Sequence, residues 1–236
     1  MKYKAVIFDF DGTICDTGEG ILKSAKYALD YYNIEAPEYT ELTFFIGPPL
    51  LVTFQEKFGV DANMADKLER YTNKGLLESE LYDGIKELLS KLKKENIKLG
   101  IASSKPQDYV EALLDHYGVK SYFDVICGVT FSADCESKAN IISRCIKELD
   151  TQGNETLMVG DKKYDIDGAK ANMIDSVGVM WGYGSRVEFA SAGAKFIAEK
   201  IDDVFAIALG YFEQTQDVQG IFSGRIIDVH KDTVML

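Results

Sequence analysis

The hydrophobic and polar residues of this chain follow a pattern that predicts strands alternating with helices. The apolar run from Tyr3 to Phe8 has the length and composition of a buried strand. After it, apolar residues recur at helical spacing: Ile21, Leu22, Ala25, Ala28, Leu29 and Tyr32. Further along we predict helices at 84–95, 106–117, 137–149, 164–172 and 201–212, and strands at 97–103, 123–129, 155–160, 175–180 and 195–198. This alternation indicates βαβ units and a parallel sheet.

A helical insert separates the first strand from its expected partners. Residues 38–80 carry helix-like patterns broken at Gly47-Pro48-Pro49, with no convincing strand, and Asp16 or Thr17 is placed to cap the helix before them. We expect the insert to fold as a small α-helical cap that excludes water and selects substrates by opening and closing. The expected core comprises residues 1–15 and 82–236, and the cap residues 16–81.

The tail from about Gln214 alternates apolar and polar residues around Ser223-Gly224. This pattern predicts a β-hairpin within residues 215–236 that turns at the Ser-Gly dipeptide. Such a hairpin adds edge strands, contacts a partner, or is a surface element without function, and the sequence leaves these alternatives open.

Charge and cysteine content narrow the function classes. A net charge of -12 argues against a nucleic-acid or anionic-membrane surface. The four cysteines, Cys15, Cys127, Cys135 and Cys145, have no CxxC or metal-site spacing and fit a reducing compartment. No apolar run is long enough to span a membrane, and no signal peptide is evident. We therefore expect a cytoplasmic protein, a monomer or homodimer, that binds neither nucleic acid nor membrane.

Two carboxylates follow the first strand, in the sequence Asp9-Phe10-Asp11-Gly12-Thr13. Strand residues two apart project to the same face, and open α/β sheets place their sites at the carboxyl ends of strands. Asp9 and Asp11 would therefore face one reacting centre. An ordinary Asp-Gly turn is the alternative interpretation.

Later strands also end in polar residues. The strand at 97–103 leads into Ser103-Ser104-Lys105-Pro106, and the strand at 155–160 into Gly160-Asp161 and Asp165. Lys138 lies near the start of a helix. Taken singly, these residues are equally typical of turns, helix caps and solvated surfaces. Their occurrence together, each at a strand end or helix start, indicates a site.

The chemistry of this set suits a phosphate and a hard cation. Asp9, Asp161, Asp165 and the Asp11 backbone carbonyl supply the oxygen ligands that Mg²⁺ accepts. Ser103 and Lys138 would contact a phosphoryl group, as a hydroxyl donor and a point charge. Backbone N–H groups near Gly12 and Ser104 would complete an anion cradle.

These residues resemble the haloacid dehalogenase superfamily over nearly the whole chain. Asp9-Phe10-Asp11-Gly12-Thr13 is similar to its first motif, Ser103 to its second, Lys138 to its third, and Gly160-Asp161 with Asp165 to its fourth. Within it, the phosphoglycolate-phosphatase-like branch is most similar. The resemblance implies a Rossmann-like three-layer α/β core with a parallel sheet and a type-1 helical cap inserted after the first strand.

The resemblance also implies residue roles. Asp9 would be the nucleophile that forms an aspartyl-phosphate, and Asp11 the acid that protonates the leaving oxygen and then activates water. Asp161 and Asp165 would hold Mg²⁺, which offsets repulsion between carboxylate and phosphate. The remaining residues fall into two groups: Gly12, Thr13, Ser103, Ser104 and Lys138 around the phosphate, and Glu19, Phe45, Ile46, Gly47 and Pro48 on the cap's substrate side.

One motif departs from the family pattern, since Glu136-Ser137-Lys138-Ala139-Asn140 lacks the Lys-Pro pair of many relatives. The presence of Asp11 favours phosphoester hydrolysis or phosphoryl transfer over attack on carbon. The leading hypothesis is a Mg²⁺-dependent phosphatase of a small phosphorylated metabolite, such as phosphoglycolate or a nucleoside monophosphate. A sugar-phosphate mutase of the β-phosphoglucomutase type and a non-catalytic sensor of a phosphorylated ligand are the alternatives.

Overall fold

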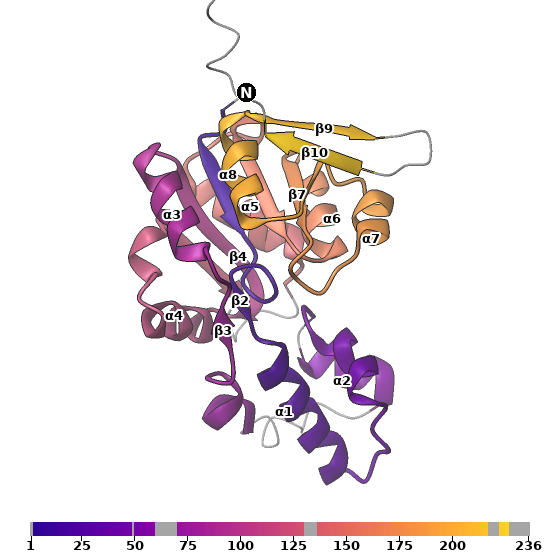
Figure 1. Ribbon diagram of the computed structural model, residues 1–236. Helices are drawn as coiled ribbons and strands as arrows, with labels where there is room; N and C mark the ends of the chain where they lie inside the picture. Colours follow the sequence, from indigo (N-terminus) through magenta and orange to yellow (C-terminus); the bar gives the residue numbers. More distant parts are fainter. Residues whose placement is uncertain (1, 49, 60–69, 130–135, 217–221, 227–236) are drawn as a thin grey trace, which may run out of the picture.

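The core of the protein is a six-stranded parallel sheet, confirming the predicted α/β architecture (Figure 1). The computed structural model describes residues 2–48, 50–59, 70–129, 136–216 and 222–226. Across the sheet the strands are β5 (Val125–Val129), β4 (Lys98–Pro106), β1 (Ala5–Phe8), β6 (Thr156–Gly160), β7 (Asp175–Val179) and β8 (Phe196–Ala198). With β1 central, the carboxyl ends of β1, β4 and β6 meet at one edge.

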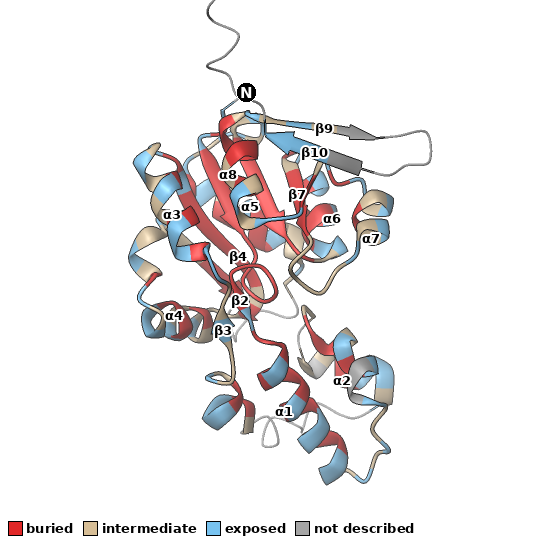
Figure 2. Ribbon diagram, in the orientation of Figure 1, coloured by how far each residue is buried: buried red, intermediate tan, exposed pale blue. Residues whose placement is uncertain are grey.

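Helices cover both faces of this sheet because its strands are apolar on both sides. Val6 and Phe8 pack into one core cluster, and Ala5 and Ile7, which alternate with them, pack into another. The first face is covered by α3 (Ile85–Lys94), α4 (Gln107–His116) and α8 (Ile201–Leu209). The second is covered by α5 (Lys138–Leu149) and α6 (Lys163–Ala171), with α7 (Arg186–Ala192) beside α6. Figure 2 shows the buried strands between these helices.

Residues 15–81 leave the core at the carboxyl-end edge of the sheet and return there (Figure 1). The two connections pair as short antiparallel strands, β2 (Cys15–Asp16) and β3 (Glu80–Leu81). Between them lie α1 (Gly18–Tyr31), η1 (Tyr39–Phe45), α2 (Leu50–Phe58) and the π-helical η3 (Tyr71–Gly75). These elements share their own apolar cluster, which includes Leu29, Phe45 and Phe54. We refer to them as the cap; its independence as a domain stays a prediction.

The structure differs from the sequence prediction in the C-terminal third. Helix α7 was not predicted, and the helix expected at 201–212 ends at Leu209 because Gly210 adopts φ +79° and terminates it. The chain then forms β9 (Phe212–Gln216), which pairs with β10 (Phe222–Ile226) as an antiparallel hairpin.

The prediction that this hairpin turns at Ser223-Gly224 is wrong. Gly224 lies inside β10, opposite Gln214, and the residues that connect the two strands, 217–221, are outside the described part. A Cβ at Gly224 would lie 2.1 Å from the Phe212 ring, so this glycine makes room for an aromatic side chain. The tail from 227 to 236 is also outside the described residues.

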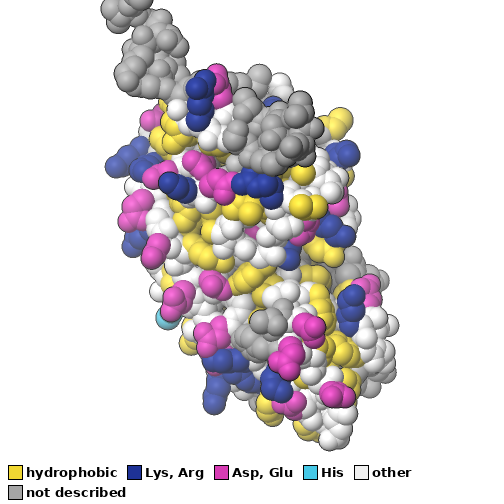
Figure 3. All heavy atoms as spheres, turned by 45° about the vertical axis from the view of Figure 1, so that its right-hand side comes forward, with side chains coloured by type: hydrophobic (Ala, Val, Ile, Leu, Met, Phe, Trp, Pro, Cys, Tyr) yellow, Lys and Arg dark blue, Asp and Glu magenta, His cyan; other side chains and the backbone are white. Residues whose placement is uncertain are grey.

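The cysteines and the surface add little chemistry of their own. Cys15, Cys127 and Cys145 are buried free thiols, and Cys135 is outside the described residues. Acidic and basic side chains are interspersed on the face drawn in Figure 3. Among the helices that the structure describes, none has both the length and the apolar composition needed to cross a membrane.

Candidate active site

The end of β1 turns sharply and brings Asp9 and Asp11 into the interior. The Asp9 N–H donates to the Val159 carbonyl at 2.8 Å, which extends the strand ladder by one residue. The Phe10 carbonyl then accepts three backbone N–H groups, from Thr13, Ile14 and Cys15. Both carboxylates are buried in this compact turn.

Gly12 is required by this geometry. Its φ of +75° lies in the left-handed region, and a Cβ there would lie 2.1 Å from Asp161 Oδ2. The loop after β1 therefore packs directly against the carboxylate that follows β6.

Asp9 belongs to a cluster of three buried carboxylates and one buried ammonium. Ligand oxygens of Asp9, Asp161 and Asp165 all lie within 4.8 Å of one another. Lys138 Nζ lies 2.7 Å from Asp9 Oδ1 and 2.9 Å from Asp165 Oδ1, and it donates to the Ala102 carbonyl at 3.0 Å. The cluster thus joins the ends of β1, β4 and β6 with the start of α5.

Local helix starts fix these side chains. The Ser137 hydroxyl accepts from the Asn140 N–H at 3.2 Å and caps α5, which places Lys138 in the first helical residue. Asp165 Oδ2 accepts from the Lys162 N–H at 3.0 Å at the start of α6. That contact leaves Asp165 Oδ1 directed at Lys138.

The cluster has more negative than positive charge. Burial raises the pKa of Asp9 to about 7; Lys138 opposes the rise and Asp165 adds to it. Burial, Asp165 and Asp9 together hold the pKa of Asp161 well above its usual range. Burial alone would lower the pKa of Lys138, but Asp165 and Asp9 outweigh it and the pKa is raised.

This donor set fits a hard cation. Asp161 Oδ1 is buried and has no hydrogen-bond partner among the described residues, whereas its Oδ2 accepts from the Tyr183 N–H at 2.9 Å. Asp165 Oδ1 likewise has no hydrogen bond, only its ion pair with Lys138. Carboxylate oxygens gathered in this way, one of them without a hydrogen-bond partner, are suitable ligands for a divalent ion.

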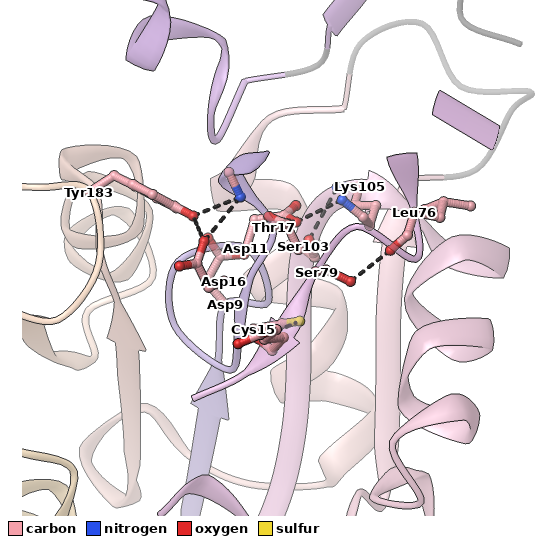
Figure 4. Close-up of polar contacts among 12 residues, drawn as sticks. Asp9, Asp11, Cys15, Asp16, Thr17, Leu76, Ser79, Ser103, Lys105 and Tyr183 are labelled. Atoms are coloured by element: carbon pink, nitrogen blue, oxygen red, sulfur yellow. Dashed lines mark hydrogen bonds and ion pairs between the residues drawn. The ribbon is translucent and has the colours of Figure 1, made fainter. Parts of the chain in front are cut away.

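Asp11 faces a different set of partners (Figure 4). Its Oδ1 accepts from the Thr17 hydroxyl at 2.6 Å and lies 2.7 Å from the Nζ of the buried Lys105. Thr17 occupies the N-cap position of α1, yet its side chain caps no helix N–H because it bonds to Asp11. The sequence predicted that Asp16 or Thr17 caps this helix. Of the two, Asp16 binds a helix N–H: its Oδ1 accepts from the Gly18 N–H at 3.2 Å.

Tyr183 connects the acidic cluster to the first cap connection. Its backbone N–H bonds to Asp161, its hydroxyl hydrogen-bonds to Asp16, and that hydroxyl accepts from the Gly18 N–H at 2.8 Å. Burial and then Asp16 raise the pKa of this phenol, so it stays a neutral donor. The ring also packs against the cap's apolar cluster.

The residues expected around a phosphate lie beside Asp9 and Asp11. Ser103 is buried at the end of β4, where its hydroxyl accepts from the Lys105 N–H at 3.1 Å, and Ser104 is half-buried. Thr13 is fully buried, and within the part of the chain that the structure describes its hydroxyl has no hydrogen-bond partner. Their contact with a phosphate stays a prediction, as does Asp11 as a metal ligand through its carbonyl.

The predicted cap residues occupy different environments. Phe45 and Ile46 are buried in the cap's own cluster, which gives them a packing role. Gly47 faces the core, since a Cβ there would lie 3.5 Å from Lys162, and Pro48 is half-buried. Glu19 is exposed and paired with Lys23. It lines a cavity of about 680 Å³ at the junction with Asp16 and Tyr183.

Sequence reasoning missed three side chains of this region: Lys105, Thr17 and Tyr183. For Lys105 a signal existed, because it follows Ser103 by two residues, the same spacing that pointed to Asp9 and Asp11. Thr17 lies at a position typical of a helix cap, so no feature of the sequence pointed to its hydrogen bond with Asp11. Tyr183 had no local signal, since its partners lie more than 20 residues away.

A doubly wound α/β core, a helical insert at its carboxyl-end edge and a buried carboxylate cluster together define a class of phosphate-processing α/β enzymes. The chain belongs to the haloacid dehalogenase-like hydrolase family, whose model matches residues 6–179. The family resemblance inferred from the motifs is therefore confirmed.

Individual relatives fall within this family. Over 187 residues the chain is 35% identical to tyrosine-protein kinase PtkA of Mycobacterium tuberculosis, covering 78% of this chain but only 64% of PtkA. It is 33% identical over 193 residues to a 5'-nucleotidase of Pseudomonas aeruginosa, covering 80% of this chain and 87% of that protein. A crystal structure described as a predicted phosphatase from Clostridium acetobutylicum aligns with a TM-score of 0.80 at 36% identity, covering 86% of this chain and 97% of that one.

Proposed function

We propose that this protein is a Mg²⁺-dependent phosphatase that hydrolyses a small phosphorylated metabolite through an aspartyl-phosphate intermediate. The observation that carries the proposal is the position of Asp9. This carboxylate is buried at a strand end beside the Lys138 ammonium and close to the carboxylates of Asp161 and Asp165. A cation site directly beside a nucleophile is what phosphoryl transfer requires.

In the first half-reaction, a carboxylate oxygen of Asp9 attacks the phosphorus atom, and the bond between phosphorus and the leaving oxygen breaks. Asp11, protonated at that stage, gives its proton to the leaving oxygen, so the product departs as an alcohol. Asp9 then carries the phosphoryl group as a mixed anhydride.

In the second half-reaction, water attacks the phosphorus atom of the aspartyl-phosphate. Asp11, now a carboxylate, takes a proton from that water, and the phosphorus–Asp9 bond breaks. Inorganic phosphate leaves and the Asp9 carboxylate is restored.

Asp9, Asp161 and Asp165, with the Asp11 carbonyl, would hold the Mg²⁺. When bound, the ion supplies positive charge that offsets repulsion between Asp9 and the phosphoryl oxygens. Lys138 and Ser103 bind phosphoryl oxygens and orient Asp9. The backbone around Gly12, Thr13 and Ser104 completes the anion cradle.

Substrate choice would depend on the cap. Phosphoglycolate and nucleoside monophosphates are the candidate classes, and the relationship to a 5'-nucleotidase supports including the latter. We place the leaving group near the loop Phe45–Pro48, whose Gly47 faces Lys162, and near Glu19 at the junction. The protein would act in the cytoplasm as a monomer or homodimer.

The test is a panel of phosphorylated metabolites with Mg²⁺ or EDTA, in which released phosphate is measured for the native protein and Asp9→Asn. We expect Mg²⁺-dependent release that Asp9→Asn abolishes, and the best substrate identifies the metabolite class. No release from any compound by folded, Mg²⁺-bound protein would overturn the proposal.

Transfer to an acceptor other than water is the second candidate. The relationship to a tyrosine kinase favours it, and so does the burial of both Asp9 and Asp11, which limits access of water. A sugar-phosphate mutase would use the same two residues and depend on a bisphosphate activator. These reactions are separated from hydrolysis by adding sugar bisphosphates and a tyrosine-containing polypeptide to the panel. The phosphoryl group of the donor is labelled, and its transfer to the acceptor is measured against its release as inorganic phosphate.

A further inference from the structure

Lys105 is a buried cation that the proposed mechanism leaves without a role. Its side chain is 4% exposed, and its Nζ lies 2.7 Å from Asp11 Oδ1. A buried ammonium is costly unless a negative charge offsets it, and Asp11 is its ion-pair partner within the described part of the chain. Burial alone would lower the pKa of Lys105, but Asp11 outweighs it and the pKa is raised, so Lys105 stays an ammonium.

The same ammonium also contacts the cap. Its Nζ lies 5.2 Å from the centroid of the Tyr71 ring and 5.9 Å from that of Phe10. Tyr71 begins the π-helical segment η3 and is buried in the cap's apolar cluster with residues of α1. An ammonium at this distance from an aromatic ring is attracted to it, most strongly where water is excluded.

Lys105 therefore lies between the carboxylate of Asp11 and an element of the cap. Thr17, on the connection that leads into the cap, binds the same Oδ1 from another side (Figure 4). Both groups that hold Asp11 are thus attached to the cap or in contact with it. If the cap moves away from the core, Lys105 loses its contact with the Tyr71 ring, and the contacts that hold the Asp11 carboxylate change.

We propose that Lys105 is a positioning residue that holds the Asp11 carboxyl for proton transfer and couples its orientation to the cap through Tyr71. This inference rests on the proposed role of Asp11 as acid and base. In this arrangement the Asp11 carboxyl is oriented for proton transfer only when the cap lies against the core.

The kinetic test uses two substrates that differ in their need for an acid. An alkyl phosphate needs a proton on its leaving oxygen, whereas p-nitrophenyl phosphate leaves as a stable phenolate. In Lys105→Met we expect kcat/KM for the alkyl phosphate to fall about 100-fold, the cost of misplacing a reacting group, and kcat/KM for the aryl phosphate to fall no more than about threefold. Lys98→Met, at the other end of β4, is the matched control and should alter neither value. Equal loss on both substrates, or no loss, contradicts the proposal.

Two variants of Tyr71 test the cap contact. Tyr71→Leu removes both the ring and the hydroxyl that interact with Lys105 and should reproduce the same selectivity at about tenfold, whereas Tyr71→Phe keeps the ring and should show a smaller effect. If Tyr71→Leu discriminates between the two substrates no more than Tyr71→Phe does, the cap is not coupled through this residue.

Hydrogen exchange tests the coupling without any turnover. Lys105→Met and Asp11→Asn should both raise exchange in residues 70–76, because each removes one member of the Asp11–Lys105–Tyr71 series, and Lys98→Met should not. Unchanged exchange in the first two variants refutes the coupling. If the native protein turns over none of the phosphate esters but exchange changes as stated, the proposed function alone is refuted and the coupling between Lys105 and the cap stands.

Discussion

The two carboxylates at the end of β1 each face a buried lysine, but the two pairs have different surroundings. Lys138 lies 2.7 Å from Asp9 and Lys105 lies 2.7 Å from Asp11, and all four side chains are less than 10% exposed. Around Asp9 the further groups are carboxylates of the core. Around Asp11 they are a hydroxyl of the cap connection and, beyond Lys105, an aromatic ring of the cap.

This difference separates two tasks. The Asp9 side has three carboxylates to one ammonium, an excess of negative charge that suits the proposed cation. The Asp11 side has its charge balanced by Lys105 and its Oδ1 doubly held, so it is built to fix one orientation. The residues around Asp9 belong to the core, whereas those around Asp11 include a residue of the cap connection and contact a ring of the cap.

The largest effect is expected from Lys138→Met. Asp9 and Asp165 then lose the ammonium that pairs with both, and removing one partner of a buried pair costs about 3–5 kcal/mol. We expect the midpoint of thermal unfolding to fall sharply in EDTA and to recover in part with Mg²⁺, while turnover of alkyl and aryl phosphates is lost equally.

Lys105→Met is the matched control for that experiment, since it removes an equally buried lysine from the other pair. Its unfolding midpoint should respond to Mg²⁺ as the native protein does. A variant of Lys138 that discriminates between the two substrates, or a Lys105 variant with an altered Mg²⁺ response, would show that the two sides are not separate.

Gly12→Ala is expected to have the next largest effect, confined to the Asp9 side. The added Cβ would lie 2.1 Å from Asp161 Oδ2, and φ +75° disfavours alanine. Because Asp161 must shift, the stabilisation by Mg²⁺ seen in thermal unfolding should shrink. Gly193→Ala has a similar φ of +86° with nothing within 4 Å, so it reports backbone strain alone. If both variants respond equally to Mg²⁺, the packing of Gly12 on Asp161 does not matter for the cation.

The same division explains how much was predictable from sequence. The sheet, its flanking helices and the cluster of Asp9, Lys138, Asp161 and Asp165 follow from alternating patterns and from polar residues at strand ends, since parallel strands end at one edge. Lys105 was missed because its partner Asp11 is 94 residues away in the chain, and Thr17 because its position is that of a helix cap. Ser223-Gly224 misled because the Phe212 ring, which occupies the space beside Gly224, is a contact across strands that composition cannot show.

The smallest expected effect concerns Tyr183, which contacts both sides. Its N–H holds Asp161 while its hydroxyl binds Asp16 and the Gly18 N–H. Tyr183→Phe removes only the hydroxyl, so we expect a loss of about 1 kcal/mol in the free energy of unfolding and an unchanged Mg²⁺ response. Exchange at residues 17–20 should increase slightly, because the Gly18 N–H loses one of its two acceptors and keeps only Asp16. Were the Mg²⁺ response to weaken instead, the junction and the acidic cluster would be linked through this side chain, and the separation of the two sides would be incomplete.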